Sequence, residues 1–123
     1  MSIKSYQDLE VWQRGMDLAA EAYRLTQMLP REEMFGLTSQ IRRAASSIPA
    51  NIAEGWGRDS TGEFQQFLRI AQGSLRELET HLLLCQRVGL LHHDPAKPLL
   101  ETCSILGRQL IALQRSLTLK KGS

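Results

Sequence analysis

The sequence is poor in the residues that staple small proteins or build reactive centres. Only two of its 123 residues are cysteines, Cys85 and Cys103, and no C-x-x-C pair occurs. Disulfide-held secreted domains carry more cysteines, and zinc sites usually need such pairs. No apolar run approaches the ~20 residues of a membrane span, and the N-terminus, MSIKSYQDLEVW, has no apolar signal segment. We therefore expect a cytoplasmic protein with no membrane contact, no metal and no other cofactor.

The charge of the chain is small but unevenly distributed. Residues 1–90 hold ten Lys and Arg against eleven Asp and Glu, a balance of −1. Residues 91–123 hold five Lys and Arg against two acids, a balance of +3. The basic excess therefore lies at the C-terminal end, where it predicts an attraction for anionic partners.

Apolar residues recur every three or four positions along four segments, about residues 6–29, 34–56, 61–88 and 95–118. This is the period of an amphipathic helix, and no segment shows the period of two that a strand needs. Ser5 and Ser60 open S-x-x-D and S-x-x-E capping signals, Gly89 is suited to end a helix, and Asp94 precedes a proline. We predict one all-α domain over residues 1–123, an antiparallel up-down-up-down four-helix bundle.

The first helix carries two apolar stripes about 120° apart. One comprises Leu9, Trp12, Met16, Ala19 and Tyr23, and the other Val11, Gly15, Leu18, Ala22, Leu25 and Leu29. One stripe suffices for a bundle core, so the second needs a partner, which is either a neighbouring helix or another subunit. As candidates for a subunit interface we take Val11, Leu18, Ala22 and Leu25.

The second helix contains a proline within its apolar pattern. Pro49 lacks an amide proton and its ring clashes with the carbonyl of Ala45, which predicts a kink. The serines at positions 46 and 47 are candidates to satisfy the freed backbone groups. Alternatively the helix breaks, with Ser47 capping a short new helix. We favour the kinked helix.

No set of residues points to catalysis. Glu77 and His81 are four residues apart beside a leucine stripe, which favours an ion pair over a metal site. His92 and His93 are adjacent in a loop and are poorly placed to converge on one metal. Both cysteines lie on buried stripes, where thiols act as small hydrophobic groups. We therefore expect a protein that is not an enzyme and has no evident small-molecule substrate.

Three segments together resemble a known family. They read DLEVWQ at 8–13, FGLTSQIRRAASSIPANIAEG at 35–55 and EFQQFLRIAQGSLRELETHLLL at 63–84. The chain resembles, from about Tyr6 to Leu91, the four-helix bundle proteins encoded in intervening sequences of bacterial 23S rRNA genes. That resemblance implies a homopentamer of unsettled biochemical role. Similar proteins include the accessory variability determinant of diversity-generating retroelements, which works with a reverse transcriptase and its template RNA through a basic surface.

The resemblance makes RNA or another nucleic acid a candidate partner, because Arg side chains bind phosphates bidentately. The candidate binding residues are Arg42, Arg43, Arg69, Arg76, Arg108, Arg115, Lys120 and Lys121. A competing interpretation makes the polar stripe around Arg43 a structural network, in which Arg43 or Arg42 pairs with a glutamate. A protein-only scaffold that binds no nucleic acid is the alternative function.

Overall fold

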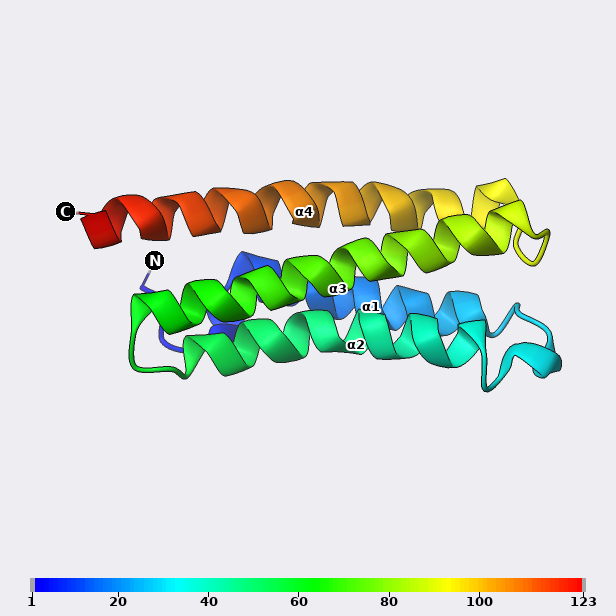
Figure 1. Cartoon of the computed structure of the whole chain (residues 1–123), viewed down its shortest axis with the longest axis horizontal. Helices are drawn as coiled ribbons and strands as arrows, with labels where there is room; N and C mark the ends of the chain where they lie inside the picture. Colours follow the sequence, from blue (N-terminus) through cyan, green and yellow to red (C-terminus); the bar gives the residue numbers. More distant parts are fainter. Residues whose placement is uncertain (1, 123) are drawn as a thin grey trace.

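Four long helices lie side by side in the computed structural model, which describes residues 2–122 apart from the side chains of residues 93, 121 and 122 (Figure 1). They are α1 (Glu10–Thr26), α2 (Leu37–Trp56), α3 (Thr61–Arg87) and α4 (His93–Gly122). Two 3-10 turns, η1 (Tyr6–Asp8) and η2 (Arg31–Glu33), precede α1 and α2. The loops between consecutive helices lie at alternate ends of the molecule, so each helix runs opposite to the one before it. No strand occurs among the described residues, and the prediction of an all-α four-helix bundle is confirmed.

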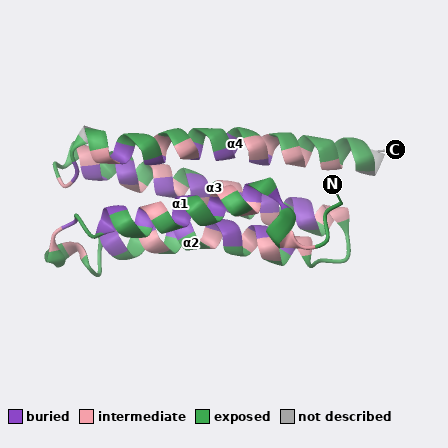
Figure 2. Ribbon diagram, turned by 180° about the vertical axis from the view of Figure 1, so that it is seen from behind, coloured by how far each residue is buried: buried purple, intermediate pink, exposed green. Residues whose placement is uncertain are grey.

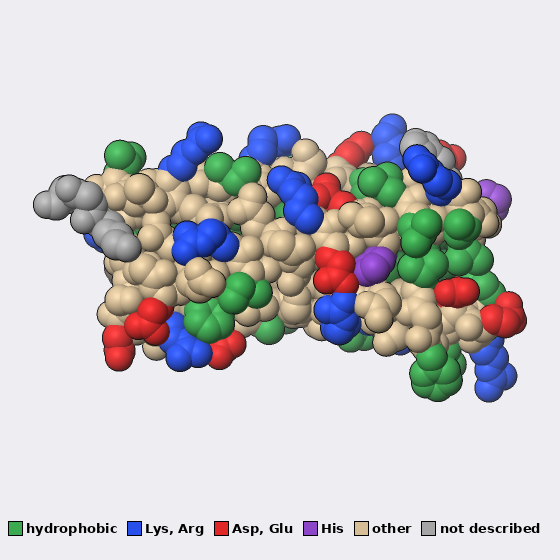
Figure 3. Space-filling model, in the orientation of Figure 1, with side chains coloured by type: hydrophobic (Ala, Val, Ile, Leu, Met, Phe, Trp, Pro, Cys, Tyr) green, Lys and Arg blue, Asp and Glu red, His purple; other side chains and the backbone are tan. Residues whose placement is uncertain are grey.

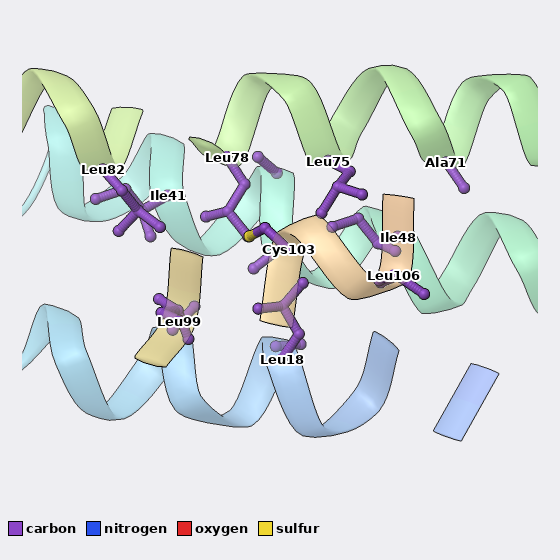
Figure 4. Close-up of a cluster of buried hydrophobic side chains, with 14 of the residues drawn as sticks. Leu18, Ile41, Ile48, Ala71, Leu75, Leu78, Leu82, Leu99, Cys103 and Leu106 are labelled. Carbon is purple, nitrogen blue, oxygen red and sulfur yellow. The ribbon is translucent and has the colours of Figure 1, made fainter. Parts of the chain in front are cut away.

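The core lies along the axis that all four helices surround (Figure 4). On α3 the apolar residues that recur at helical spacing are buried, namely Phe64, Leu68, Ala71, Leu75, Leu78, Leu82 and Cys85. Leu18 of α1, Ile48 of α2 and Leu106 of α4 are fully buried against them. Burial of this apolar surface is the main force that holds the bundle, at roughly 1.5–3 kcal/mol for each large side chain.

The two apolar stripes of α1 have different surroundings. Val11, Leu18, Ala22 and Leu25 are at most 8% exposed and belong to the core of the single chain. They are therefore not available to another subunit, and our choice of this stripe as a subunit interface was wrong. Neighbouring helices of the same bundle cover it. The other stripe faces outward in part, with Met16 46% and Tyr23 43% exposed.

The predicted capping signals are present, with one difference at the N-terminus. Ser5 forms its capping box with Asp8, but the box caps η1, and extended backbone at Leu9 separates η1 from α1. The Ser60 hydroxyl accepts a hydrogen bond from the amide of Glu63 at 3.1 Å and caps α3. Gly89, with φ of 80°, follows α3, and the amide of Leu90 donates to the carbonyl of Cys85 at 2.8 Å. This is a Schellman ending, which needs the left-handed backbone that glycine adopts at low cost.

Helix α2 continues unbroken through Pro49, so the alternative of two separate helices is wrong. The neighbouring serines do not bond to the carbonyl that the proline frees. Ser46 donates to the carbonyl of Arg43 and Ser47 to that of Ala44, one turn back in each case. Pro49 is itself buried, and α1 approaches it closely at Gly15, where an added Cβ would lie 3.6 Å from the proline Cβ.

Helix α4 differs from the others in its start and in its burial. It begins at His93, so Asp94 lies inside the first turn and not before it as we predicted. Pro95 is still tolerated there, because amides of the first turn have no partner within the helix. Between residues 111 and 120 no side chain is buried, and Figure 2 shows this C-terminal part of α4 as mostly exposed.

Candidate nucleic-acid interface

The arginines of α2 are occupied by contacts within the bundle. The guanidinium of Arg42 lies over the ring of Tyr23, 4.9 Å from its centroid, and its Nε donates to the Thr26 hydroxyl at 2.8 Å. Thr26 is buried, so this contact helps to fix α2 against the end of α1. A side chain held in this way has little freedom to reach a phosphate.

Arg43 forms an ion pair with Glu77 of α3, as the structural interpretation of this stripe predicted. His81 contacts the same carboxylate oxygen, with its Nε2 3.0 Å from Glu77 Oε2. The hydrogen bond to His81, and then the contacts of Arg43, lower the pKa of Glu77, while its partial burial opposes them. The charge of Arg43 is thus compensated within the chain.

Polar side chains also join α3 to its other neighbour, α4. The amide of Gln65, which is 7% exposed, donates to the hydroxyl of Thr118 at 2.7 Å and to the carbonyl of Gln114. Gln114 in turn donates to Gln72 Oε1 at 2.8 Å. These contacts define the line along which the two antiparallel helices meet, which we call the seam.

The seam is flanked on its solvent side by basic residues of both helices. Arg69 and Arg76 lie within ~40° of the seam line on α3, and Arg108 and Arg115 lie ~90° from the seam line on α4. Because the helices are antiparallel, these displacements fall on the same side, opposite the buried leucines. Figure 3 shows basic side chains along both α3 and α4 on this face. Adding the two that continue the rows, we define six seam cations: Arg69, Arg76, Arg87, Lys97, Arg108 and Arg115.

The register of the seam sets these six residues opposite one another. A Cβ added at Gly107 of α4 would lie 3.7 Å from Arg76 Nη1 of α3, and Gln65 of α3 donates to Thr118 of α4. Because the helices are antiparallel, each residue further along α3 lies beside a residue one position earlier on α4. Three cross-seam pairs result, and we name them here: Arg69 with Arg115, Arg76 with Arg108, and Arg87 with Lys97. The pairs are seven and eleven residues apart, or ~10 and ~16 Å along the helices.

Few carboxylates neutralise the seam cations. Arg76 pairs with Glu79 at 3.0 Å, whereas Arg69 bonds to the neutral Gln66 and Arg108 to the neutral Ser104. Among the described residues, no carboxylate pairs with Arg87, Lys97 or Arg115. Residues 64–76 and 102–123 contain no acid at all, and Glu101 is the acidic neighbour on α4. The seam therefore carries a local positive charge that the formal net charge of the whole chain, +2, does not reveal.

The structure places four of the eight predicted binding residues along the seam and three of them elsewhere. Arg42 and Arg43 lie on α2, and Lys120 lies on α4 more than 100° around the helix from Arg115. The side chain of Lys121 is outside the described residues. Arg87 and Lys97 were missing from our binding set, although the spacing 97, 108, 115 repeats on one helix face. Only the register of α3 against α4 relates them to each other.

The remaining titratable groups do not assemble into a reactive site. Burial raises the pKa of the Cys103 thiol to about 12, with Glu79 adding to the shift. Burial, and then the charge of Glu33, raise the pKa of Cys85. Both thiols are therefore protonated at neutral pH. The described side chains include no group of three His, Cys, Asp or Glu that could hold a metal. No helix within the described part of the chain is long and apolar enough to cross a membrane.

Comparison with known proteins gives a family. No curated protein matches the sequence. A crystal structure from Bacteroides thetaiotaomicron, of a protein with unknown function from the S23 ribosomal protein family, is similar with a TM-score of 0.79 and 26% identity. The match covers 85% of this chain and 97% of that one. The family described as 23S rRNA-intervening sequence protein matches residues 7–112, which include α1, α2, α3 and most of α4. The chain belongs to the 23S rRNA-intervening sequence protein family.

Proposed function

We propose that this protein is a non-enzymatic, oligomeric bundle that binds nucleic acid, with RNA as the preferred partner, through the seam cations. The observation that carries this proposal is the set of three cross-seam pairs, in which five of the six cations have no carboxylate partner among the described residues. Cations that face one another repel, and an anionic backbone relieves that repulsion. Binding would release counterions from the phosphates and would weaken as salt rises.

Oligomerisation would multiply this surface. One chain offers about four phosphate contacts, which gives weak binding at physiological salt. A closed ring repeats the same patch on every subunit, and linked weak contacts add to a higher avidity. The homopentamer that the family resemblance implies would carry five copies of the seam.

A pair of charge-matched variants tests the seam. One is Arg69→Gln with Arg108→Gln and Arg115→Gln, and the other is Arg24→Gln with Arg31→Gln and Arg58→Gln. Each lowers the formal net charge by three, from +2 to −1. Binding to a structured RNA is measured by fluorescence anisotropy across a salt series. The seam variant should lose roughly 30-fold in affinity at low salt, and its salt slope should fall by about three.

The control variant should keep most of its affinity, because it changes long-range attraction and no phosphate contact. Equal losses in the two variants would show that net charge alone attracts the RNA. Unaltered binding in the seam variant would exclude the seam cations as the interface.

A protein-only scaffold remains the second candidate, and an apolar groove between α1 and α2 favours it. The groove has a volume of about 430 Å³ and includes Trp12, Met16, Tyr23, Pro49 and Ala50. Tyr6 closes one end, with its ring 5.3 Å from that of Trp12. Met16→Glu should dissociate an assembly that buries this groove, whereas Ser39→Glu on the exposed start of α2 should not. Sedimentation analysis of both variants decides the point, and an intact assembly in Met16→Glu would exclude the groove as the contact.

A further inference from the structure

The arrangement of the seam cations points to one class of nucleic acid. We infer that the seam face binds double-stranded RNA, with each row of cations on one of the two phosphate backbones. This inference rests on the proposed function and narrows its substrate. It comes from three features of the seam: two rows of charge, the absence of stacking side chains, and the width of the face.

The two rows suit two strands. Arg69, Arg76 and Arg87 lie on α3, and Lys97, Arg108 and Arg115 lie on α4, with matching spacings because the helices are antiparallel. Packed helices have axes 8–10 Å apart, which sets the scale of the separation between the rows, and Arg76 leans toward α4, with its Nη1 3.7 Å from the Cβ position of Gly107. A single strand has one backbone and would satisfy one row while the other row stayed unpaired. A duplex presents two backbones at once.

Stacking side chains are missing from this face. Proteins that hold single-stranded RNA usually stack its bases on aromatic rings. Helix α4 has no Phe, Tyr or Trp. The aromatic residues of α3 are Phe64 and Phe67, and both contact Gly55 of α2, on the side away from α4. Unpaired bases would therefore find no platform beside the cations.

The width of the face selects RNA over DNA. The major groove of B-DNA is about 12 Å wide and admits one helix, whereas two packed helices form a face of ~20 Å. A-form RNA presents a wide, shallow minor groove lined with 2′-hydroxyl groups. Ser104, which accepts a hydrogen bond from Arg108, lies on the seam side of that cation. Its hydroxyl is suited to bond with 2′-hydroxyls between the two phosphate rows.

The test compares three probes of about 20 nucleotides or base pairs, a length that covers the ~16 base pairs spanned by known duplex-RNA-binding domains. They are an RNA duplex, one of its strands without internal pairing, and the DNA duplex of the same sequence. Dissociation constants are measured with the full chain at low and intermediate salt. The RNA duplex should bind roughly tenfold more tightly than the strand and roughly threefold more tightly than the DNA duplex, with the steepest salt dependence of the three.

Two double variants test the role of the rows. Arg69→Gln with Arg87→Gln removes most of one row, and the preference for duplex over strand should fall to about twofold. Arg69→Gln with Arg115→Gln removes one cross-seam pair and the same charge but leaves both rows, so binding weakens while the preference stays. Circular dichroism confirms that both variants keep their helices.

A strand that binds the wild-type chain as tightly as the duplex would overturn the inference and leave the proposed function intact. A DNA duplex bound as tightly as the RNA duplex would overturn the assignment to RNA. No binding of any probe at low salt would remove the proposed function together with the inference.

Discussion

Helix α3 packs against α2 on one side and α4 on the other, and the two contacts are built differently. Against α2, backbones approach so closely that a Cβ at Gly55 would lie 2.5 Å from the Cβ of Phe67. The arginine that crosses this contact, Arg43, has a glutamate partner. Against α4, a Cβ at Gly107 would meet nothing closer than 3.6 Å, and glutamine side chains fill the contact.

The contact between α2 and α3 stabilises the fold, whereas the contact between α3 and α4 leaves cations on the surface for a partner. Compensated charge and close packing between α2 and α3 contribute to the free energy of folding. Cations opposite one another along the seam oppose folding slightly, since most of them have no carboxylate partner in the described part of the chain. An external polyanion would supply the missing charge. Three pairs of substitutions test this contrast.

The largest expected effect is on core packing. Ile48→Ala removes a fully buried side chain from α2 and leaves a cavity, which should lower the free energy of unfolding by about 3 kcal/mol. Leu117→Ala on α4 removes a partly exposed side chain and should cost about 1 kcal/mol. Urea denaturation of both variants measures the difference. Equal losses would show that the end of α4 is as well packed as the middle of α2.

A pair of glycine substitutions tests how closely the helices approach. Gly55→Ala should destabilise by about 2 kcal/mol, because the new methyl group overlaps Phe67 and the backbones must separate. Gly107→Ala meets ordinary contact distances and should stabilise by up to ~1 kcal/mol through its higher helix propensity. The two shifts in urea midpoint should have opposite signs. A destabilising Gly107→Ala would mean that the seam is as tight as the contact between α2 and α3.

The smallest effect concerns the carboxylate that neutralises Arg43. The pKa of Glu77 is lowered in the folded chain, so its contribution is fully present above the unfolded value of about 4.5 and is lost as pH falls through the folded value. The side chain is about one-third exposed, so Glu77→Gln should cost less than ~1 kcal/mol at pH 7. The difference from wild type should shrink as pH falls below about 4.5. Glu32→Gln, at an exposed turn, serves as the control, and a cost that does not change as pH is lowered would contradict the ion-pair explanation.

The helices were predictable because their signals are local. The period of the α3 stripe identified its buried residues, and Ser60 and Gly89 marked its two ends. The choice between the stripes of α1 was not local. Leu18 and Met16 are both apolar at helical spacing, and their burial depends on where α2 and α4 lie. The start of α4 was misplaced because a proline in the first turn is compatible with more than one starting residue.

The candidate site was only half predictable for the same reason. Composition located the basic excess near the C-terminus, and Arg108 and Arg115 were identified from it. The pairing of Arg87 with Lys97 depends on the register between two helices. The apolar period of a single helix does not determine that register. Arg42 is excluded from the candidate site by its contact with the Tyr23 ring. A sequence does not distinguish a solvated arginine from one packed on a ring.

The glutamines of the seam have a consequence beyond joining two helices. Leucines repeat so evenly on α4 that the helix could slide by one turn and still pack, since one methyl group replaces another. Gln65 and Gln72 oppose that slide, because each would lose its hydrogen-bond partner on α4, and Gln65 would remain buried without one. These hydrogen bonds fix the register of α3 against α4. They thereby also fix the distances between cations that lie on two separate helices.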